Sequence, residues 1–281
     1  MTRGPLPYWR GCARRTSAIA RESRRLRAGA SDHSSGELLP VIDLHCHLLP
    51  GVDDGATDLP TALAMGELLV AAGFTHVASS PHSGEGPGGD VAPAAAEQAR
   101  IALQEYFRQS GLPLTLLANA EHHVSPLLFD RIARGGVVPI GGSNNWLLVE
   151  LPWQWMPNVD GVLFQLQLRG YHVLLAHPER YGFLDVKALR PLAERGVKLQ
   201  LELGSFVGRY GSRAASRAQR LVQEGVAHVL ATDLHRPQTW LGDALAEVAR
   251  CFGDDALQRA CATNPQAILN GCDGDAVLPF G

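Results

Sequence analysis

Residues 39–47 read LPVIDLHCH, an apolar run that stops at two histidines one residue apart. The run Leu39–Leu44 predicts a short buried strand, bounded by Pro40, whose end carries His45 and His47. An apolar strand, a polar loop and a helix with apolar residues every three to four positions then follow one another repeatedly along the chain. This stretch therefore sets the pattern of the sequence, in which short apolar strands end at polar side chains.

Seven such strand–helix units are predicted. The further strands are expected at Thr75–Ser80, Leu112–Ala120, Trp146–Leu151, Tyr171–Ala176, Val197–Leu203 and Val226–Thr232. The helices are expected at Thr61–Ala72, Ala92–Ser110, Pro126–Arg134, Val159–Arg169, Val186–Arg195, Arg213–Glu224, Leu241–Cys251 and Ala256–Leu269. Such alternation requires right-handed crossovers and a parallel sheet. Seven units within about 230 residues favour a single barrel-like α/β domain.

Composition excludes several classes of protein. The chain has 281 residues, a net charge of −3 and 46% apolar residues, which argues against wholesale disorder. No apolar stretch approaches the roughly 20 residues of a membrane-spanning helix, so no membrane insertion is expected. Five scattered cysteines without CxxC spacing exclude a disulfide scaffold and indicate a reducing compartment, which we expect to be the cytoplasm.

The charge is unevenly distributed. Residues 1–40 carry eight arginines against three acidic residues, a balance of +5, and the rest of the chain carries 17 basic and 25 acidic residues, a balance of −8. This leader has no apolar segment after its arginines, so it does not resemble a secretory signal. An Arg-rich arm is able to contact nucleic acid, anionic lipid or an acidic partner. We expect instead a disordered leader over 1–40, or translation from an upstream start, with no nucleic-acid partner and a folded domain over 41–281.

Polar residues gather where the predicted strands end. In a parallel barrel these positions share the C-terminal face, where such folds carry their active sites. The histidines and carboxylates in question come from six strands: His45, His47, Asp54, His82, Glu121, Glu150, His177, Asp233 and His235. One histidine alone is more often structural than a ligand, but this whole set predicts a metal site.

Five histidines and four carboxylates without cysteine suit Mn²⁺, Fe²⁺ or Zn²⁺ and disfavour a structural thiolate zinc site. Nine ligands exceed the needs of one ion, so we expect two or three ions with Glu121 as the bridge. Neighbouring metal ions activate water and clamp phosphoryl oxygens, which favours hydrolysis of phosphate esters. Arg180 and Arg236 follow two of the ligands, and their guanidinium groups suit phosphate oxygens.

Several motifs together resemble one family. VIDLHCHLLPGVDDGATD (41–58), SSPH (79–82), AEHHVSP (120–126), LVELP (148–152), AHPERY (176–181) and ATDLH (231–235) are similar to motifs of the PHP (polymerase and histidinol phosphatase) superfamily. The GVDDG block and LQLELGSFVGRYG (199–211) resemble, within it, the bacterial manganese-dependent protein tyrosine phosphatases of capsule and exopolysaccharide synthesis. The resemblance covers roughly residues 41–270.

This resemblance implies a PHP-type distorted (β/α)7 barrel, a metallophosphatase domain over 41–281 and a trinuclear site with Mn²⁺ as the expected metal. The implied ligands are His45, His47, Glu121 and Asp233 for one ion, Glu121, Glu150 and His177 for the second, and Asp54, His82 and His235 for the third. Arg180 and Arg236 would handle phosphate. The implied substrate is a phosphotyrosine protein, the Tyr-rich tail of a membrane tyrosine autokinase.

Two alternatives stay open at this point. One is a small-molecule phosphatase of the same superfamily, such as a histidinol-phosphate phosphatase. The other is a non-catalytic regulatory PHP module, which we would expect to have lost ligands. Glu202 is an extra ligand or, as we expect, a neighbour of the ligands, and we expect His122 and His123 to support the site or the fold rather than bind metal.

Overall fold

The computed structural model describes residues 40–281, so residues 1–39 of the predicted leader lie outside the described residues. Its strands are β1 (Ile42–Cys46), β2 (His76–Ser79), β3 (His82–Ser83), β4 (Thr115–Ala118), β5 (Glu121–His123), β6 (Trp146–Glu150), β7 (His172–Ala176), β8 (Lys198–Glu202) and β9 (Val229–Ala231). Its helices are α2 (Leu59–Ala71), α3 (Pro93–Gln109), α4 (Leu128–Ala133), α5 (Val159–Leu168), α6 (Val186–Glu194), α7 (Leu203–Phe206), α8 (Gly211–Gln223), α9 (Leu241–Phe252), α10 (Asp254–Gln258) and α11 (Asn264–Leu269). A π-helical segment at Arg259–Thr263 joins α10 to α11, and a 3-10 turn lies at Gly274–Ala276.

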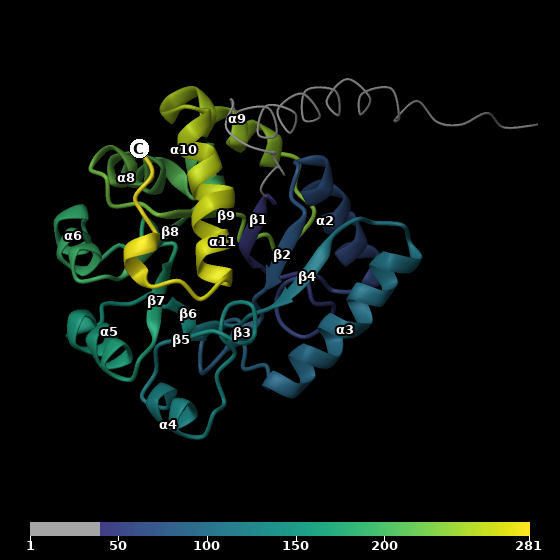
Figure 1. The fold of residues 1–281 in the computed structure, drawn as a ribbon, viewed down its shortest axis with the longest axis horizontal. Coiled ribbons are helices and arrows are strands. Elements are labelled where there is room, and N and C mark those ends of the chain that lie inside the picture. The colour runs from purple at the N-terminus through teal and green to yellow at the C-terminus, as the bar shows by residue number, and fades with distance from the viewer. Residues whose placement is uncertain (1–39) are drawn as a thin grey trace, which may run out of the picture.

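All paired strands run parallel, which confirms the predicted α/β fold with parallel sheets. One sheet has the order β1-β2-β4 and the other the order β3-β5-β6-β7-β8-β9. The central strands β6 and β7 read WLLVE and HVLLA and are almost entirely buried, because helices cover parallel sheets. Figure 1 shows these strands in the middle of the molecule with α3, α4, α5, α6 and α8 around them.

The prediction that the second and third strands stop before His82 and Glu121 is incomplete. Both residues instead begin short additional strands, β3 and β5, which pair with each other in register His82↔Glu121. Pro81 separates β2 from β3, and a proline has no N–H for a sheet hydrogen bond, so the strand is interrupted there. The break divides the strands into two sheets while keeping both residues on one rim.

The last strand approaches the first. Beyond β9, the amide of Asp233 donates to the carbonyl oxygen of His45 at 2.8 Å, and the amide of His47 donates to that of Leu234 at 3.0 Å. The ends of β1 and β9 therefore lie side by side, and the residues that follow them share one rim.

Two further predictions need correction. Leu203, predicted as the last residue of a strand, instead begins the one-turn helix α7. The helix predicted over Ala256–Leu269 contains the π-helical segment, whose Ala260 and Cys261 are fully buried.

The core has two parts. An inner cluster between the strands includes Ile42, Leu44, Trp146 and Leu148, and Ile268 of α11 packs into it. A larger outer cluster fills the space between the strands and the surrounding helices. The strands are thus buried on both faces, which leaves their C-terminal rim as the place for polar side chains.

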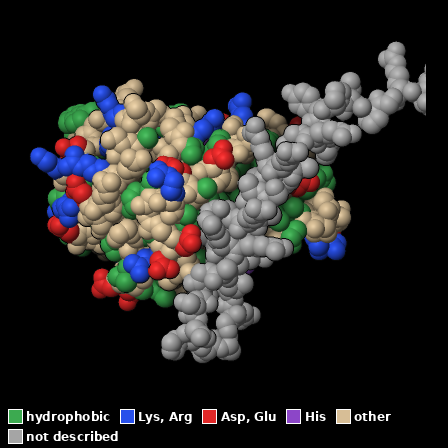
Figure 2. Space-filling view, turned by 90° about the horizontal axis from the view of Figure 1, so that it is seen from above, with side chains coloured by type: hydrophobic (Ala, Val, Ile, Leu, Met, Phe, Trp, Pro, Cys, Tyr) green, Lys and Arg blue, Asp and Glu red, His purple; other side chains and the backbone are tan. Residues whose placement is uncertain are grey.

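The surface in Figure 2 has Lys and Arg interspersed with Asp and Glu on the described part of that face. Within residues 40–281, none of the helices has both the length and the apolar character needed to cross a bilayer.

Candidate metal centre

The structure brings all nine predicted ligands together at the C-terminal rim. Their donor atoms form four overlapping groups, each with all its atoms within 4.8 Å of one another. The groups are His47, Asp54, His82 and His235; His45, His47 and Glu121; His45, His177 and Asp233; and His82, Glu121 and Glu150. Because the groups share members, the division of ligands among separate ions remains a prediction.

The innermost atoms belong to His45 and His47. Their Nε2 atoms lie 3.2 Å from each other, each lies 3.2 Å from Asp233 Oδ1, and they lie 3.3 and 3.4 Å from Glu121 Oε2. Ligand atoms bound about 2.0–2.2 Å from one ion lie roughly 3.0–3.5 Å apart in tetrahedral and octahedral sites. Asp233 Oδ1 is also buried without a hydrogen-bond partner among the described residues. The donor set therefore fits a divalent cation.

The outer nitrogens of the same two rings are held by neighbours. His45 Nδ1 lies 2.9 Å from Gln200 Oε1, and His47 Nδ1 lies 2.9 Å from Asp53 Oδ2. Both partners are oxygen acceptors, so they favour a proton on Nδ1 and leave Nε2 as the ring atom that would bind a metal ion. In metal sites, hydrogen bonds of this kind at the other ring nitrogen orient the histidine ligands.

Glu121 has the contacts expected of a bridge. Its Oε2 lies 3.1 Å from His82 Nδ1 and close to His45 and His47, while its Oε1 lies 2.9 Å from His177 Nε2. The two oxygens thus face different histidines. His177 Nε2 also lies 3.9 Å from Glu150 Oε1.

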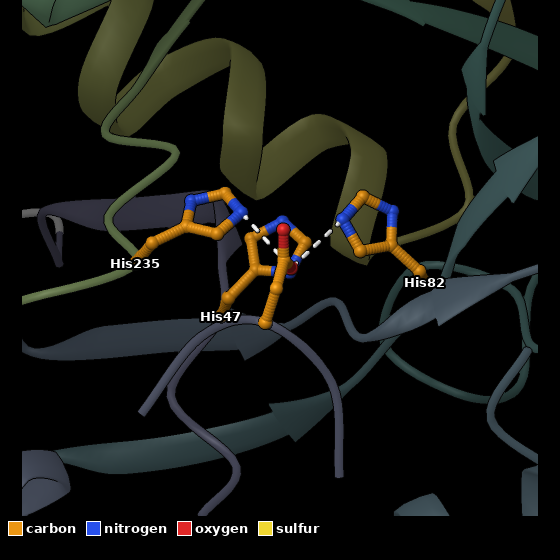
Figure 3. A group of neighbouring side chains, drawn as sticks. His47, His82 and His235 are labelled. Atoms are coloured by element: carbon orange, nitrogen blue, oxygen red, sulfur yellow. Dashed lines mark ion pairs between the residues drawn. The ribbon is translucent and has the colours of Figure 1, made fainter. Parts of the chain in front are cut away.

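Asp54 joins two histidines on the outer side of the cluster. Its Oδ1 lies 3.2 Å from His82 Nε2 and 3.4 Å from His235 Nε2. In Figure 3 the rings of His47, His82 and His235 surround a common carboxylate, and the dashed lines mark these two ion pairs. The His47 and His235 rings stack with centroids 4.0 Å apart.

The buried charges of the cluster stabilise one another. Burial alone would lower the pKa of His45, but the carboxylates of Glu121 and Asp233 raise that pKa to about 9. Burial alone would raise the pKa values of Glu121 and Asp233, but the imidazole of His45 is the strongest influence holding both well below their ordinary value. The carboxylates are therefore ionised, and the site attracts positive charge.

Two of the candidate ligands have unusual backbone conformations. His177 has φ 36° and Asp233 has φ 47°, in a region that residues other than glycine rarely occupy. Backbone strain of this kind concentrates at functional sites.

A cavity of about 270 Å³ opens onto the cluster. It is lined by Asp54, His82, Pro87, Gly88, Glu121, Glu150, Trp153, His177, Arg180, Tyr210, Asp233 and His235. A Cβ added to Gly88 would lie 1.8 Å from His82 Cδ2, so only glycine lets this loop pack against the His82 ring.

The two predicted arginines differ in position. Arg180 lines the cavity, and its Nη1 donates to Glu202 Oε1 at 2.6 Å and to Asp233 Oδ2 at 3.0 Å. Burial opposes the charge of Arg180, but Glu202 and Asp233 outweigh it and raise its pKa. Arg236 is exposed and does not line this cavity, so its role in the site remains a prediction.

The structure also places Glu202, His122 and His123, whose roles the sequence left open. Glu202 is fully buried and contacts Arg180. His123 Nδ1 lies 3.1 Å from Glu150 Oε2, whereas His122 Nε2 lies 3.0 Å from the carbonyl oxygen of Val138. His123 thus contacts the candidate ligand Glu150, whereas His122 contacts the backbone of the loop at Val138.

Four residues around the cluster were not predicted from the sequence: Asp53, Gln200, Trp153 and Tyr210. Asp53 is the first acid of the GVDDG block, and the pair of acids there was the available signal. Gln200 is a buried polar residue in an otherwise apolar strand. Trp153 and Tyr210 lie in loops, where no periodicity singles them out.

Comparison with known proteins shows the family of the chain. The family described as "Capsular polysaccharide synthesis, CpsB/CapC" matches residues 41–270. The chain belongs to the CpsB/CapC family. This confirms the family resemblance.

Named members of the CpsB/CapC family are similar over most of the chain. Tyrosine-protein phosphatase YwqE of Bacillus subtilis is 29% identical over 235 residues, which span 82% of this chain and 91% of YwqE. Putative tyrosine-protein phosphatase CapC of Staphylococcus aureus is 26% identical over 202 residues, which span 69% of this chain and 77% of CapC.

A solved structure of the CpsB/CapC family has the same fold. It is described under "Crystal structures of YwqE from Bacillus subtilis and CpsB from Streptococcus pneumoniae, unique metal-dependent tyrosine phosphatases". It has a TM-score of 0.76 and 27% identity, and the match covers 85% of this chain and 99% of that one.

Proposed function

We propose that this protein is a metal-dependent phosphatase that hydrolyses phosphotyrosine in proteins and regulates capsule or exopolysaccharide synthesis. The observation that carries the proposal is the buried cluster of five histidines and four carboxylates at one rim of a CpsB/CapC-family fold. The names of the relatives, which are tyrosine-protein phosphatases, support the choice of substrate.

The finer features that we propose are those of the PHP superfamily. They are a distorted seven-unit barrel over residues 41–281 and two or three ions, with Mn²⁺ favoured over Fe²⁺ or Zn²⁺ for a set of nitrogen and oxygen donors. The proposed ligands are the nine residues of the cluster, with Glu121 as the bridge. We propose the cytoplasm as the location and the tail of a membrane tyrosine autokinase as the partner.

Divalent ions at such a cluster supply Lewis-acid activation of water and of the phosphoryl oxygens. The chain itself orients the phosphate. Within residues 40–281 both ion pairs of Arg180 use Nη1, so its Nε and Nη2 donors remain for phosphate oxygens. A guanidinium held in this way stabilises the charge of a phosphoryl transition state.

The leaving group also favours tyrosine. A phenolate, with a pKa near 10, leaves more easily than an alkoxide and needs little help from a general acid. We therefore assign no residue to protonation of the leaving group.

The test is release of phosphate from a phosphotyrosine peptide by the full chain, with and without Mn²⁺, beside histidinol phosphate as the competing substrate. We expect Mn²⁺-stimulated turnover of the peptide and its loss in His177→Ala, whose fold is checked by circular dichroism. Faster turnover of histidinol phosphate would favour a small-molecule phosphatase. Activity that survives complete metal removal would contradict the mechanism.

A further inference from the structure

One wall of the metal-centre cavity is aromatic. Among the residues that the structure describes, Trp153, which follows β6, and Tyr210, which precedes α8, are the aromatic side chains lining this cavity besides its histidines. Trp153 is 39% exposed, so part of its ring is open to an incoming molecule. The candidate metal ligands Asp54, His82, Glu121, Glu150, His177, Asp233 and His235 line the same cavity.

Both rings are held in place by the site itself. The guanidinium carbon of Arg180 lies 4.5 Å from the Trp153 ring centroid and 4.2 Å from that of Tyr210. Trp153 also stacks on the ring of His177, with centroids 5.2 Å apart and an interplanar angle of 11°. Since these side chains are already ordered, a ligand that contacts them loses little additional side-chain entropy on binding.

The aromatic and the polar parts of this lining suit the two ends of an aryl phosphate. A phosphate bound between Arg180 and the metal ligands leaves its ester group beside Trp153 and Tyr210, because all of them line one cavity. An aromatic ring there gains favourable ring–ring contacts in addition to its burial. The side chain of phosphoserine has a single methylene and presents no ring to this wall.

We propose that Trp153 and Tyr210 form a subsite for the aromatic ring of the substrate and select aryl over alkyl phosphate monoesters. This inference rests on the proposed phosphatase function, which places the phosphate beside Arg180. It adds that the preference for aryl over alkyl phosphate monoesters arises from tighter binding of the aromatic ring as well as from the better phenolate leaving group.

The test measures binding without turnover, so leaving-group chemistry cannot contribute. Calorimetry with the Mn²⁺-loaded full chain gives Kd values for benzylphosphonate, cyclohexylmethylphosphonate and inorganic phosphate. The variants are Trp153→Leu and Tyr210→Leu, and the matched controls Trp153→Phe and Tyr210→Phe keep a ring. Thermal melting checks the fold of each variant.

We expect each leucine variant to raise the Kd of benzylphosphonate about 2- to 10-fold, with the Kd of inorganic phosphate unchanged and the phenylalanine variants close to wild type. We expect wild type to prefer benzylphosphonate to its saturated analogue by a similar factor, a comparison that needs no variant. Equal affinity for the two phosphonates would overturn the proposal. So would a parallel loss of inorganic phosphate binding, because the rings would then act only by holding Arg180.

Failure of the subsite is distinguishable from failure of the proposed function. The subsite is judged on the binding ratios alone. The phosphatase proposal fails when wild type releases no phosphate from a phosphotyrosine peptide in the presence of metal.

Discussion

Replacing Asp53 by alanine removes the carboxylate that orients His47. Asp53 Oδ2 lies 2.9 Å from His47 Nδ1, and Oδ1 accepts from the amide of Gly55 at 3.0 Å. Without this acceptor the ring is free to rotate or to place its proton on Nε2, the atom that faces the cluster. Loss of such a partner typically weakens metal affinity about 10- to 100-fold, which is about 1.4–2.7 kcal/mol of binding free energy.

We therefore expect Asp53→Ala to raise the Kd for Mn²⁺ about 10- to 100-fold, as measured by calorimetry on chelator-treated protein. Asp53→Asn keeps an oxygen acceptor without the charge, so its Kd should fall between those of wild type and the alanine variant. Asp58→Ala is the matched control, because Asp58 Oδ1 caps α2 through the amide of Thr61 at 2.8 Å. That control should lose only the stability contributed by the helix cap and no metal affinity. An unchanged Kd in Asp53→Ala, or an equal loss in Asp58→Ala, would refute the reasoning.

Three further outcomes are expected. Gly88→Ala should displace the His82 ring and so weaken metal binding measured by calorimetry. The control Gly182→Ala, whose added methyl group meets nothing within 4 Å, should leave metal binding unchanged, and equal metal affinities of the two variants would contradict the close packing at Gly88. Arg180→Lys should raise the Kd of inorganic phosphate about tenfold or more, because one charged hydrogen bond contributes about 1.5–3 kcal/mol; unchanged phosphate inhibition would remove Arg180 from phosphate binding. Chelation of bound metal should lower the melting temperature, and Mn²⁺ at about 100 times its Kd should restore about 2.7 kcal/mol of folding free energy. A melting curve that does not change on chelation or on addition of Mn²⁺ would contradict metal binding to the folded state.

The order of the elements and the meeting of the nine side chains could be predicted because both follow from one regularity. Parallel strands share a C-terminal rim, so residues such as His45, Glu150 and His177, far apart in sequence, must gather there once the strands are recognised. The apolar strands are short and end at polar residues, which makes them easy to recognise.

The interruptions of strands and the partners of the ligands could not be predicted. β3 and β5 contain too few residues to show a period, and they form by pairing with neighbouring strands, β3 with β5 and β5 also with β6. Gln200 lies in a buried strand, where its position in the sequence does not distinguish it from a structural residue. Its Oε1 meets His45 only in the folded chain. Trp153 and Tyr210 meet at Arg180 from separate loops, and their meeting depends on three-dimensional packing alone.

The charge of the cluster links metal binding to the stability of the fold. Four carboxylates, Asp54, Glu121, Glu150 and Asp233, converge with five histidines, so with neutral imidazoles the group carries four negative charges. Three of these carboxylates are buried, and buried charges of one sign are costly without opposite charge beside them. Protonation of histidines such as His45 offsets part of this charge when no cation is bound, and divalent cations do so without protons. Metal binding should therefore release protons and weaken as the pH falls. Proton release on addition of Mn²⁺, followed in buffers of different ionisation enthalpy, tests this coupling; binding without proton release would show that the histidines are already neutral in the metal-free protein.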